Sequence, residues 1–371
     1  MRAGRAVGGT GIRLLAVMLL MDRTMAEPTG IDGAPGAAWL RAAGGVPTFR
    51  VRETPAGLAT QRDQVRAILW KCLGDLPPRP ASPAVVVLQR RDRGAWTEEH
   101  FEFDNGAGSR VPGVLLLPKG RTGRVPGILY NHWHGGEYDG GKLELFQSRH
   151  TPAEPGPELV RRGYAVMAID APCFGERQGQ GPDGERGSAG ELSASKLELW
   201  LGRSLWGMML RDDLMALDYL CARPEVDESR IGATGISMGA TRTWWLMALD
   251  ERIRSGVAVA CLTRYQDLVG AAGLRHHGIY YYVPGILRQF DMEAVVACVA
   301  PRSLLCLNGD QDAGSPVGGI RTIEQVVSPA WERGGKAGEF RSVIYPGVGH
   351  EYTPEMWTQM LTWFARTIPA D

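Results

Sequence analysis

The chain has 371 residues, of which 44% are hydrophobic, so it can bury a large core and has room for one to three domains. Lysine plus arginine equals aspartate plus glutamate at 41 each, and the formal net charge is zero. No overall field therefore attracts nucleic acid or an anionic membrane, and a small neutral partner is expected.

The first 26 residues have the pattern of a short secretory signal. Arginines precede an eight-residue apolar run at residues 14–21, and a small-residue pattern ends at residue 26. The run is far shorter than the ~20 apolar residues of a membrane span, so no integral membrane segment is expected. The pattern predicts export to the periplasm or the medium, whereas translation from a downstream methionine would give a cytoplasmic protein.

Strand-like and helical segments alternate from residue 60 onward. Thr60 is expected to cap a helix over residues 61–73, which Gly74 ends. Eight apolar runs are strand-like: residues 96–103, 111–118, 125–132, 164–170, 230–237, 256–262, 303–309 and 340–347. Helical stretches lie between and after them: residues 155–163, 196–222, 239–251, 291–300, 320–333 and 354–368.

Many of these strand-like runs are continuously apolar, which is typical of strands buried on both faces of a parallel sheet. Repeated strand, helix and strand units imply right-handed crossovers. The sequence therefore predicts an α/β fold with a mostly parallel central sheet and helices on both faces.

The segment Gly235-Ile236-Ser237-Met238-Gly239 lies where an apolar strand ends and a helix begins. A Gly-x-Ser-x-Gly turn is so tight that glycines flank the serine and its hydroxyl stands exposed at the strand tip. The pattern predicts a nucleophilic Ser237; the alternative is a small residue in a glycine turn. Trp244 and Trp245, on the following helix, are expected in the core.

A serine nucleophile needs a histidine base and a carboxylate that orients it. His350 follows the last predicted strand, and Asp310 and Asp312 follow the strand before it. All three lie at carboxyl ends of predicted strands, where open α/β sheets place their sites. Asp312 is favoured as the acid because Gly-x-x-Asp carries the carboxylate past the turn, whereas Asp310 suits capping of backbone donors.

The stretch NHWHGGEYDGG, residues 131–141, places His132 and His134 two positions apart. Residues two apart on a strand face the same side, so this pair could offer two nitrogens to a zinc ion. No third ligand occurs at a recognisable spacing, and no metal site is predicted. The glycine-rich turn favours a loop whose main chain matters more than its imidazoles.

These features together resemble the α/β-hydrolase superfamily over about residues 60–370. Within it the chain is similar to the bacterial branch that contains dienelactone hydrolase-like proteins, acetyl xylan esterases and prolyl oligopeptidase-like hydrolases. The narrower likeness rests on GGK (140–142), DAPCFGER (170–177) and APRSLLCLNGDQD (300–312). It implies an α/β-hydrolase catalytic domain at 60–371, which follows the signal peptide expected at 1–26 and an N-terminal extension at 27–59.

The resemblance implies acyl transfer to water, with catalytic roles for Ser237, Asp312 and His350. The tetrahedral oxyanion needs two backbone donors, and Met238 supplies the first. The second is expected in the loop after residue 131, and its candidates remain Trp133, His134 and Gly135. Trp133 stands where the superfamily usually has glycine and is also a candidate for one wall of the acyl pocket.

An aromatic, irregular stretch around residues 264–290 is a candidate cap over the pocket, and its alternative is a helix-packing surface. His276 and His277 in this stretch are further pocket candidates. Glu176 and Arg177 follow a predicted strand and are expected to form structural ion pairs rather than line the site.

The leading hypothesis is a serine esterase that cleaves carboxylic esters, such as acetyl or glucuronoyl esters of carbohydrates, without a metal or organic cofactor. Two alternatives remain: a prolyl oligopeptidase-like serine peptidase, and a binding member of the fold that has no turnover. No long β-rich region that could form a gating propeller precedes the hydrolase segment, which weighs against the peptidase.

Overall fold

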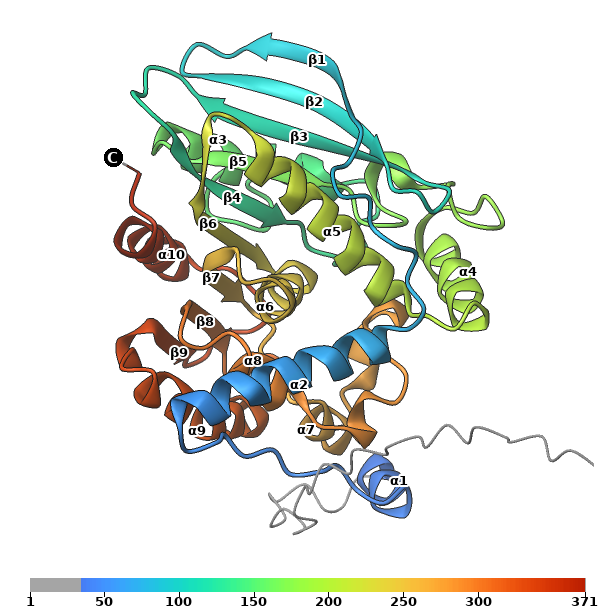
Figure 1. Cartoon of the computed structure of the whole chain (residues 1–371). Coiled ribbons are helices and arrows are strands. Elements are labelled where there is room, and N and C mark those ends of the chain that lie inside the picture. The colour runs from blue at the N-terminus through green and yellow to red at the C-terminus, as the bar shows by residue number, and fades with distance from the viewer. Residues whose placement is uncertain (1–34, 371) are drawn as a thin grey trace, which may run out of the picture.

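The computed structural model describes residues 35–370, so the predicted signal at residues 1–26 lies outside the described residues. Within the described part, nine strands form one sheet in the order β1-β2-β3-β5-β4-β6-β7-β8-β9 (Figure 1). Their bounds are β1 (Val85–Asp92), β2 (Trp96–Asp104), β3 (Arg110–Pro118), β4 (Val125–Asn131), β5 (Ala165–Ile169), β6 (Val226–Ile236), β7 (Ile253–Val259), β8 (Ser303–Gly309) and β9 (Phe340–Tyr345).

The sheet is mostly parallel, as predicted. The pairings β1/β2, β2/β3 and β3/β5 are antiparallel. From β5 through β4, β6, β7 and β8 to β9, every pairing is parallel. The carboxyl ends of these parallel strands therefore meet at one edge of the sheet, which is where loops can bring distant residues together.

Helices cover both faces of this sheet, which confirms the predicted fold class (Figure 1). Helices α2, α5, α6, α8 and α9 share one buried apolar cluster with one face of the strands, and α3 and α10 share a second cluster with the other face. The helix bounds are α1 (Pro35–Ala42), α2 (Pro55–Leu73), α3 (Pro155–Arg161), α4 (Gly187–Trp200), α5 (Leu205–Ala222), α6 (Met238–Leu249), α7 (Tyr265–Gly270), α8 (Met292–Ala297), α9 (Val317–Arg333) and α10 (Pro354–Thr367).

Alternate residues of the central strands enter opposite clusters. On β3, for example, Leu115 packs into the first cluster and Leu116 into the second, and both are fully buried. This alternation explains why the central strands are apolar at successive positions. Trp244 and Trp245 on α6 are also fully buried, so their predicted place in the core is confirmed.

Two expectations about individual elements were wrong, and one strand was not predicted. Strand β1 was not predicted, and none of its eight residues is buried, so it carries no burial signal. Helix α2 begins at Pro55, because Thr54 rather than Thr60 accepts the capping hydrogen bond, from the Gly57 N–H. The expected helix over residues 196–222 is two helices, α4 and α5.

The break between α4 and α5 lies at Gly202 and Ser204. Gly202 has φ +78°, a left-handed conformation that does not continue a helix. Two residues later the Ser204 hydroxyl accepts a hydrogen bond from the Gly207 N–H and caps α5. No helix of the described residues is long and apolar enough to span a membrane.

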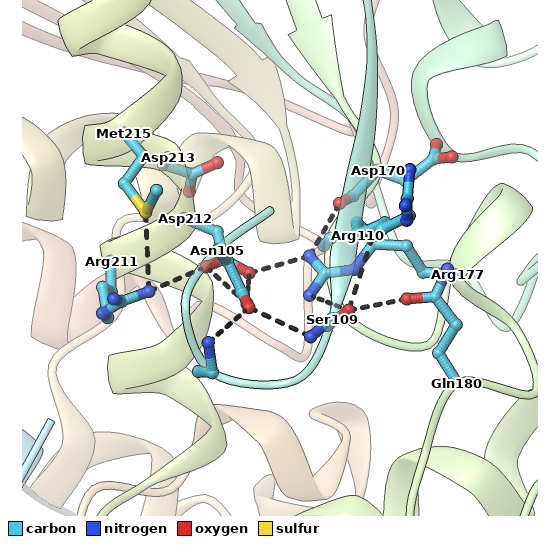
Figure 2. Close-up of polar contacts among 12 residues, drawn as sticks. Asn105, Ser109, Arg110, Asp170, Arg177, Gln180, Arg211, Asp212, Asp213 and Met215 are labelled. Atoms are coloured by element: carbon cyan, nitrogen blue, oxygen red, sulfur yellow. Dashed lines mark hydrogen bonds and ion pairs between the residues drawn. The ribbon is translucent and has the colours of Figure 1, made fainter. Parts of the chain in front are cut away.

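Buried ion pairs fix the loop that follows β5 (Figure 2). The Arg177 guanidinium lies 2.9 Å from Asp212 Oδ2 on α5 and donates to Ser109 Oγ at 3.1 Å. Asn105 donates to Asp212 at 3.1 Å, and its own Oδ1 accepts from the Ser109 N–H. The loop is thereby tied to α5 and to the β2–β3 hairpin.

A second buried pair joins two of the motif stretches. Lys142 Nζ lies 2.7 Å from Asp170 Oδ2 and also contacts Glu176. A Cβ atom at Gly141 or Gly175 would come within 2.4 Å of the Asp170 carboxylate, so both positions need glycine. The predicted ion pairing of Glu176 and Arg177 is confirmed, although each pairs with a different partner.

Candidate active site

Ser237 lies on a tight turn between β6 and α6, with φ 59° and ψ −119°. The flanking glycines are required by a close approach of β4: a Cβ at Gly235 would lie 2.2 Å from the Asn131 carbonyl oxygen, and one at Gly239 2.0 Å from the same atom. The Ser237 N–H donates to the Val259 carbonyl at 2.9 Å. The strained serine is therefore held by its surroundings, and its hydroxyl faces the carboxyl-end edge of the sheet.

Ser237, His350 and Asp312 lie in one hydrogen-bonded series. His350 Nδ1 lies 2.7 Å from Asp312 Oδ2, and His350 Nε2 lies 2.8 Å from Ser237 Oγ. Because a carboxylate can only accept, the Nδ1 nitrogen carries the proton and Nε2 is free to accept from the serine hydroxyl. The Asp312 side chain is 2% exposed and that of His350 35%, so the series runs from the interior to an open surface.

The other aspartate of this loop has a different partner. Asp310 Oδ1 accepts the Gly347 N–H at 2.7 Å and thereby joins the loop after β8 to the loop after β9. Asp310 therefore caps a backbone donor, while Asp312 faces His350. This arrangement agrees with the geometry that was expected for the two carboxylates.

The loop after β4 is held by a buried carboxyl group. The Trp133 N–H donates to Glu144 Oε2 at 2.9 Å, and the Tyr130 hydroxyl donates to Glu144 Oε1. Burial raises the pKa of Glu144 to about 7. Since Glu144 already occupies the Trp133 N–H, the candidates for a free donor in this loop narrow to His134 and Gly135. Among the described residues, no hydrogen bond is found for either of those N–H groups.

Met238 provides the other candidate donor. It is the first residue of α6, so its N–H has no carbonyl partner inside the helix. It immediately follows Ser237, and the positive end of the α6 dipole lies at the same point. A group bound at Ser237 Oγ would thus meet a helix N-terminus on one side.

His132 and His134 use their ring nitrogens on different partners. His132 is fully buried, accepts the Ala171 N–H at Nε2 and donates from Nδ1 to the Trp133 carbonyl. Burial holds the pKa of His132 well below its ordinary value, so the ring is neutral. Within residues 35–370 no group of three or more His, Cys, Asp or Glu side chains is placed to hold a metal ion.

The His134 ring is fixed by a buried acid on α4. Its Nδ1 accepts the Gly136 N–H at 3.0 Å, so Nε2 carries the proton and donates to Glu191 at 3.2 Å. The Tyr138 hydroxyl donates to the same carboxylate at 2.6 Å. The ring also stacks on Tyr280, with centroids 4.9 Å apart. The ring is thus held by Gly136 of its own loop, Glu191 on α4 and Tyr280, and the main-chain N–H of His134 remains available.

Trp133 folds back over its own loop. Its indole stacks on His150 with centroids 3.6 Å apart, and it covers Gly135, where an added Cβ would lie 2.2 Å from the ring. Gly135 has φ +49°, so glycine is needed there for both conformation and space. This packing accounts for a tryptophan at a position where glycine was expected.

Residues 265–290 form α7 and three short 3₁₀ turns whose ends are tied together. The Asp291 carboxylate accepts the N–H groups of Tyr265 at 2.8 Å and Gln266 at 2.9 Å, at the start of the segment. Within the segment, His277 points at the acid loop, with Nε2 2.9 Å from the Gly314 carbonyl oxygen. His276 is exposed. The two histidines therefore lie in different environments.

Glu144 and Glu191 were missed by reasoning from the sequence. Glu144 had one signal: it is an acid inside the apolar run LELF at residues 143–146, which a buried partner would explain. No feature of the sequence indicated a role for Glu191, since an acidic residue near the start of a helix is common.

The sheet order, the helices on both faces and the strand-turn-helix unit at Ser237 define an α/β-hydrolase. The chain belongs to the Abhydrolase family, whose model matches residues 39–321. It is 35% identical over 292 residues to "Putative hydrolase YtaP" of Bacillus subtilis (strain 168), and this match covers 78% of the chain and 94% of the relative.

Two solved structures have a similar fold. A protein described as a "putative acetyl xylan esterase", from Bacteroides fragilis NCTC 9343, has a TM-score of 0.67 and 21% identity, over 90% of this chain and 89% of that one. The glucuronoyl esterase from Solibacter usitatus has a TM-score of 0.66 and 17% identity, and the match covers 87% of this chain and 99% of that one. At these identities the likeness concerns the fold alone.

Proposed function

We propose that this protein is a serine hydrolase that cleaves carboxylic esters through an acyl-enzyme intermediate. The observation that carries the proposal is the hydrogen-bonded series from Asp312 through His350 to Ser237, with separations of 2.7 and 2.8 Å. Those separations, the proton on Nδ1 and the strained serine are what nucleophilic acyl transfer requires.

In the proposed reaction, Ser237 Oγ attacks the ester carbonyl while His350 Nε2 takes the hydroxyl proton. Asp312 stabilises the imidazolium that forms, and His350 returns the proton to the leaving alcohol. Water then attacks the acyl-enzyme by the same route. The oxyanion is stabilised by the Met238 N–H together with the N–H of His134 or Gly135, each of which is worth about 10²–10³-fold in rate.

For the substrate we propose an acetyl or glucuronoyl ester of a carbohydrate. Two considerations support this class: the fold neighbours bear esterase names, and the exposed His350 gives the site an open edge that can receive an ester on a large alcohol. The predicted export of the chain would suit such a substrate.

The test compares Ser237→Ala with wild type on p-nitrophenyl acetate, acetylated xylan, a glucuronate methyl ester and a proline-containing peptide. We expect Ser237→Ala to lose at least about 10⁴-fold in kcat and to lose labelling by a fluorophosphonate probe. Ser229→Ala, an exposed serine on β6, is the matched control. Retained turnover in Ser237→Ala would reject the mechanism, and turnover of the peptide alone would favour the peptidase alternative.

A further inference from the structure

We propose that His277 is a positioning residue of the hydrolytic site: it holds Gly314 so that the Gly314 N–H fixes the carboxylate of Asp312. This inference rests on the proposed function. It gives a role to His277, a half-buried histidine that is hydrogen-bonded neither to Ser237 nor to His350.

The contacts form a continuous series. The Gly314 carbonyl accepts from His277 Nε2 at 2.9 Å and from Thr263 Oγ1 at 3.0 Å. The Gly314 N–H donates to Asp312 Oδ1 at 2.8 Å. Asp312 Oδ2 is the atom that accepts from His350. Each oxygen of the carboxylate thus has one donor, and Gly314 provides one of the two.

The backbone of Gly314 needs restraint by its neighbours if its N–H is to keep a fixed direction. Gly314 has no Cβ, so both of its backbone dihedrals are free unless its neighbours restrain them. A Cβ there would lie 3.2 Å from Asp312 Oδ1, which is a tight contact, and 3.6 Å from His277 Nε2, which is an ordinary one, so a larger residue would crowd the carboxylate. Two donors on the Gly314 carbonyl limit rotation about this residue, and with it the direction of the N–H.

His277 is itself well fixed. Its ring stacks on the buried Tyr281, with centroids 4.1 Å apart and planes 13° from parallel. Because the Gly314 carbonyl can only accept, Nε2 carries the proton. Burial lowers the pKa of His277, so the ring is a neutral donor. The titratable groups around it are His350, Asp312 and His276.

The same segment also reaches the other side of the site. A Cβ at Gly278, next to His277, would lie 3.2 Å from His134 Nε2, and Tyr280 stacks on the His134 ring. Residues 277–280 therefore connect the acid loop after β8 with the loop after β4. His277 is the contact of this connection on the acid side.

The experiment compares His277→Ala with His277→Gln, whose side-chain amide can place a donor near the position of Nε2. In His277→Ala we expect kcat to fall about 3- to 10-fold with KM unchanged, as for the loss of one supporting hydrogen bond. The acidic limb of the kcat/KM profile should move to lower pH, because a less well fixed carboxylate stabilises the His350 imidazolium less. His277→Gln should recover both properties.

Arg275→Ala, an exposed neighbour in the same segment, is the control and should match wild type. Thr263→Val removes the second donor on the Gly314 carbonyl and should act in the same direction as His277→Ala, which keeps the inference testable if His277→Ala does not fold. Rates are normalised to the fraction of Ser237 that a fluorophosphonate labels.

Three outcomes overturn the inference: wild-type kcat in His277→Ala, an unmoved acidic limb, or no recovery in His277→Gln. If wild type turns over esters and Ser237→Ala does not, these outcomes reject only the role of His277. If Ser237→Ala retains activity, the proposed function itself fails.

Discussion

The main-chain N–H of Trp133 donates to the buried carboxyl group of Glu144, 2.9 Å away. This bond connects the loop after β4 with the 3₁₀ turn Gly141–Phe146, to which Glu144 belongs. A group that titrates near neutrality thus supports main-chain atoms beside Ser237, and its protonation can be followed as a change in stability.

We predict that Glu144 makes the protein less stable as pH rises from about 4.5 to about 7. Burial raises the pKa of Glu144 from 4.5 to about 7, so over this range the folded protein keeps a proton that the unfolded chain releases. The stabilisation is complete below pH 4.5 and is lost as pH passes 7. Glu144→Gln cannot titrate, so its free energy of unfolding in urea should rise relative to wild type across this window.

The exposed Glu332→Gln on α9 is the control for this measurement and should follow wild type at every pH. Parallel stability curves for Glu144→Gln and wild type from pH 4.5 to 8 would contradict the prediction.

We predict that alanine at Gly135 costs much more stability than alanine at Gly136. Both glycines have positive φ, +49° and +76°, so each substitution costs about 1–2 kcal/mol in backbone strain. At Gly135 the new Cβ would also lie 2.2 Å from the Trp133 ring, and this clash adds about 1–3 kcal/mol to the loss of stability. At Gly136 no atom lies within 4 Å of the new Cβ. Urea unfolding measures both, and Trp133→Ala should cancel part of the Gly135→Ala cost. Equal costs at the two positions would count against this account.

We predict that Asp212→Ala destabilises the protein by about 3–5 kcal/mol. The substitution leaves the buried Arg177 and Arg211 guanidinium groups without their carboxylate. Removal of one partner of a buried ion pair is strongly destabilising because the remaining charge is buried without compensation. The control is Glu158→Ala, which removes the more exposed pair with Arg162 and should cost less than about 1 kcal/mol. A loss for Asp212→Ala no larger than that of the control would show that the network in Figure 2 contributes little net stability.

We predict that Trp133→Gly changes the preference for acyl chain length without abolishing the labelling of Ser237. The indole lies between Gly135 and His150, and its removal opens space beside the loop. The ratio of kcat/KM for p-nitrophenyl butyrate over acetate should change by about tenfold, the effect of filling or emptying space for a methylene group or two. Trp39→Ala, which is 81% exposed on α1, should leave the ratio unchanged. An unchanged ratio in Trp133→Gly would exclude the indole as a pocket wall.

The central sheet and the serine turn could be predicted because each has a local signature. Continuous apolar runs identify strands buried on both faces, and the glycines around Ser237 identify the strand-turn-helix unit. Ser237, Asp312 and His350 could be predicted as a group because each of them follows the end of a predicted strand.

Features that depend on long-range packing could not be predicted from the sequence. Strand β1 is an edge strand without a buried residue, so neither alternation nor an apolar core face marks it. The division between α4 and α5 coincides with a backbone contact from a distant glycine: a Cβ at Gly74 would lie 2.3 Å from the Gly202 carbonyl oxygen. The partners of Glu144 and Glu191 lie in other elements, and only the folded chain brings them together.

The carbonyl oxygen of Asn131 lies where a Cβ of either Gly235 or Gly239 would have to be. The spacing between the serine turn and the loop after β4 is therefore set by main-chain atoms in contact. Side chains near this contact, such as that of Trp133, can therefore differ without changing the distance between the two backbones. Either glycine, in contrast, can be replaced only if the neighbouring strand shifts with it.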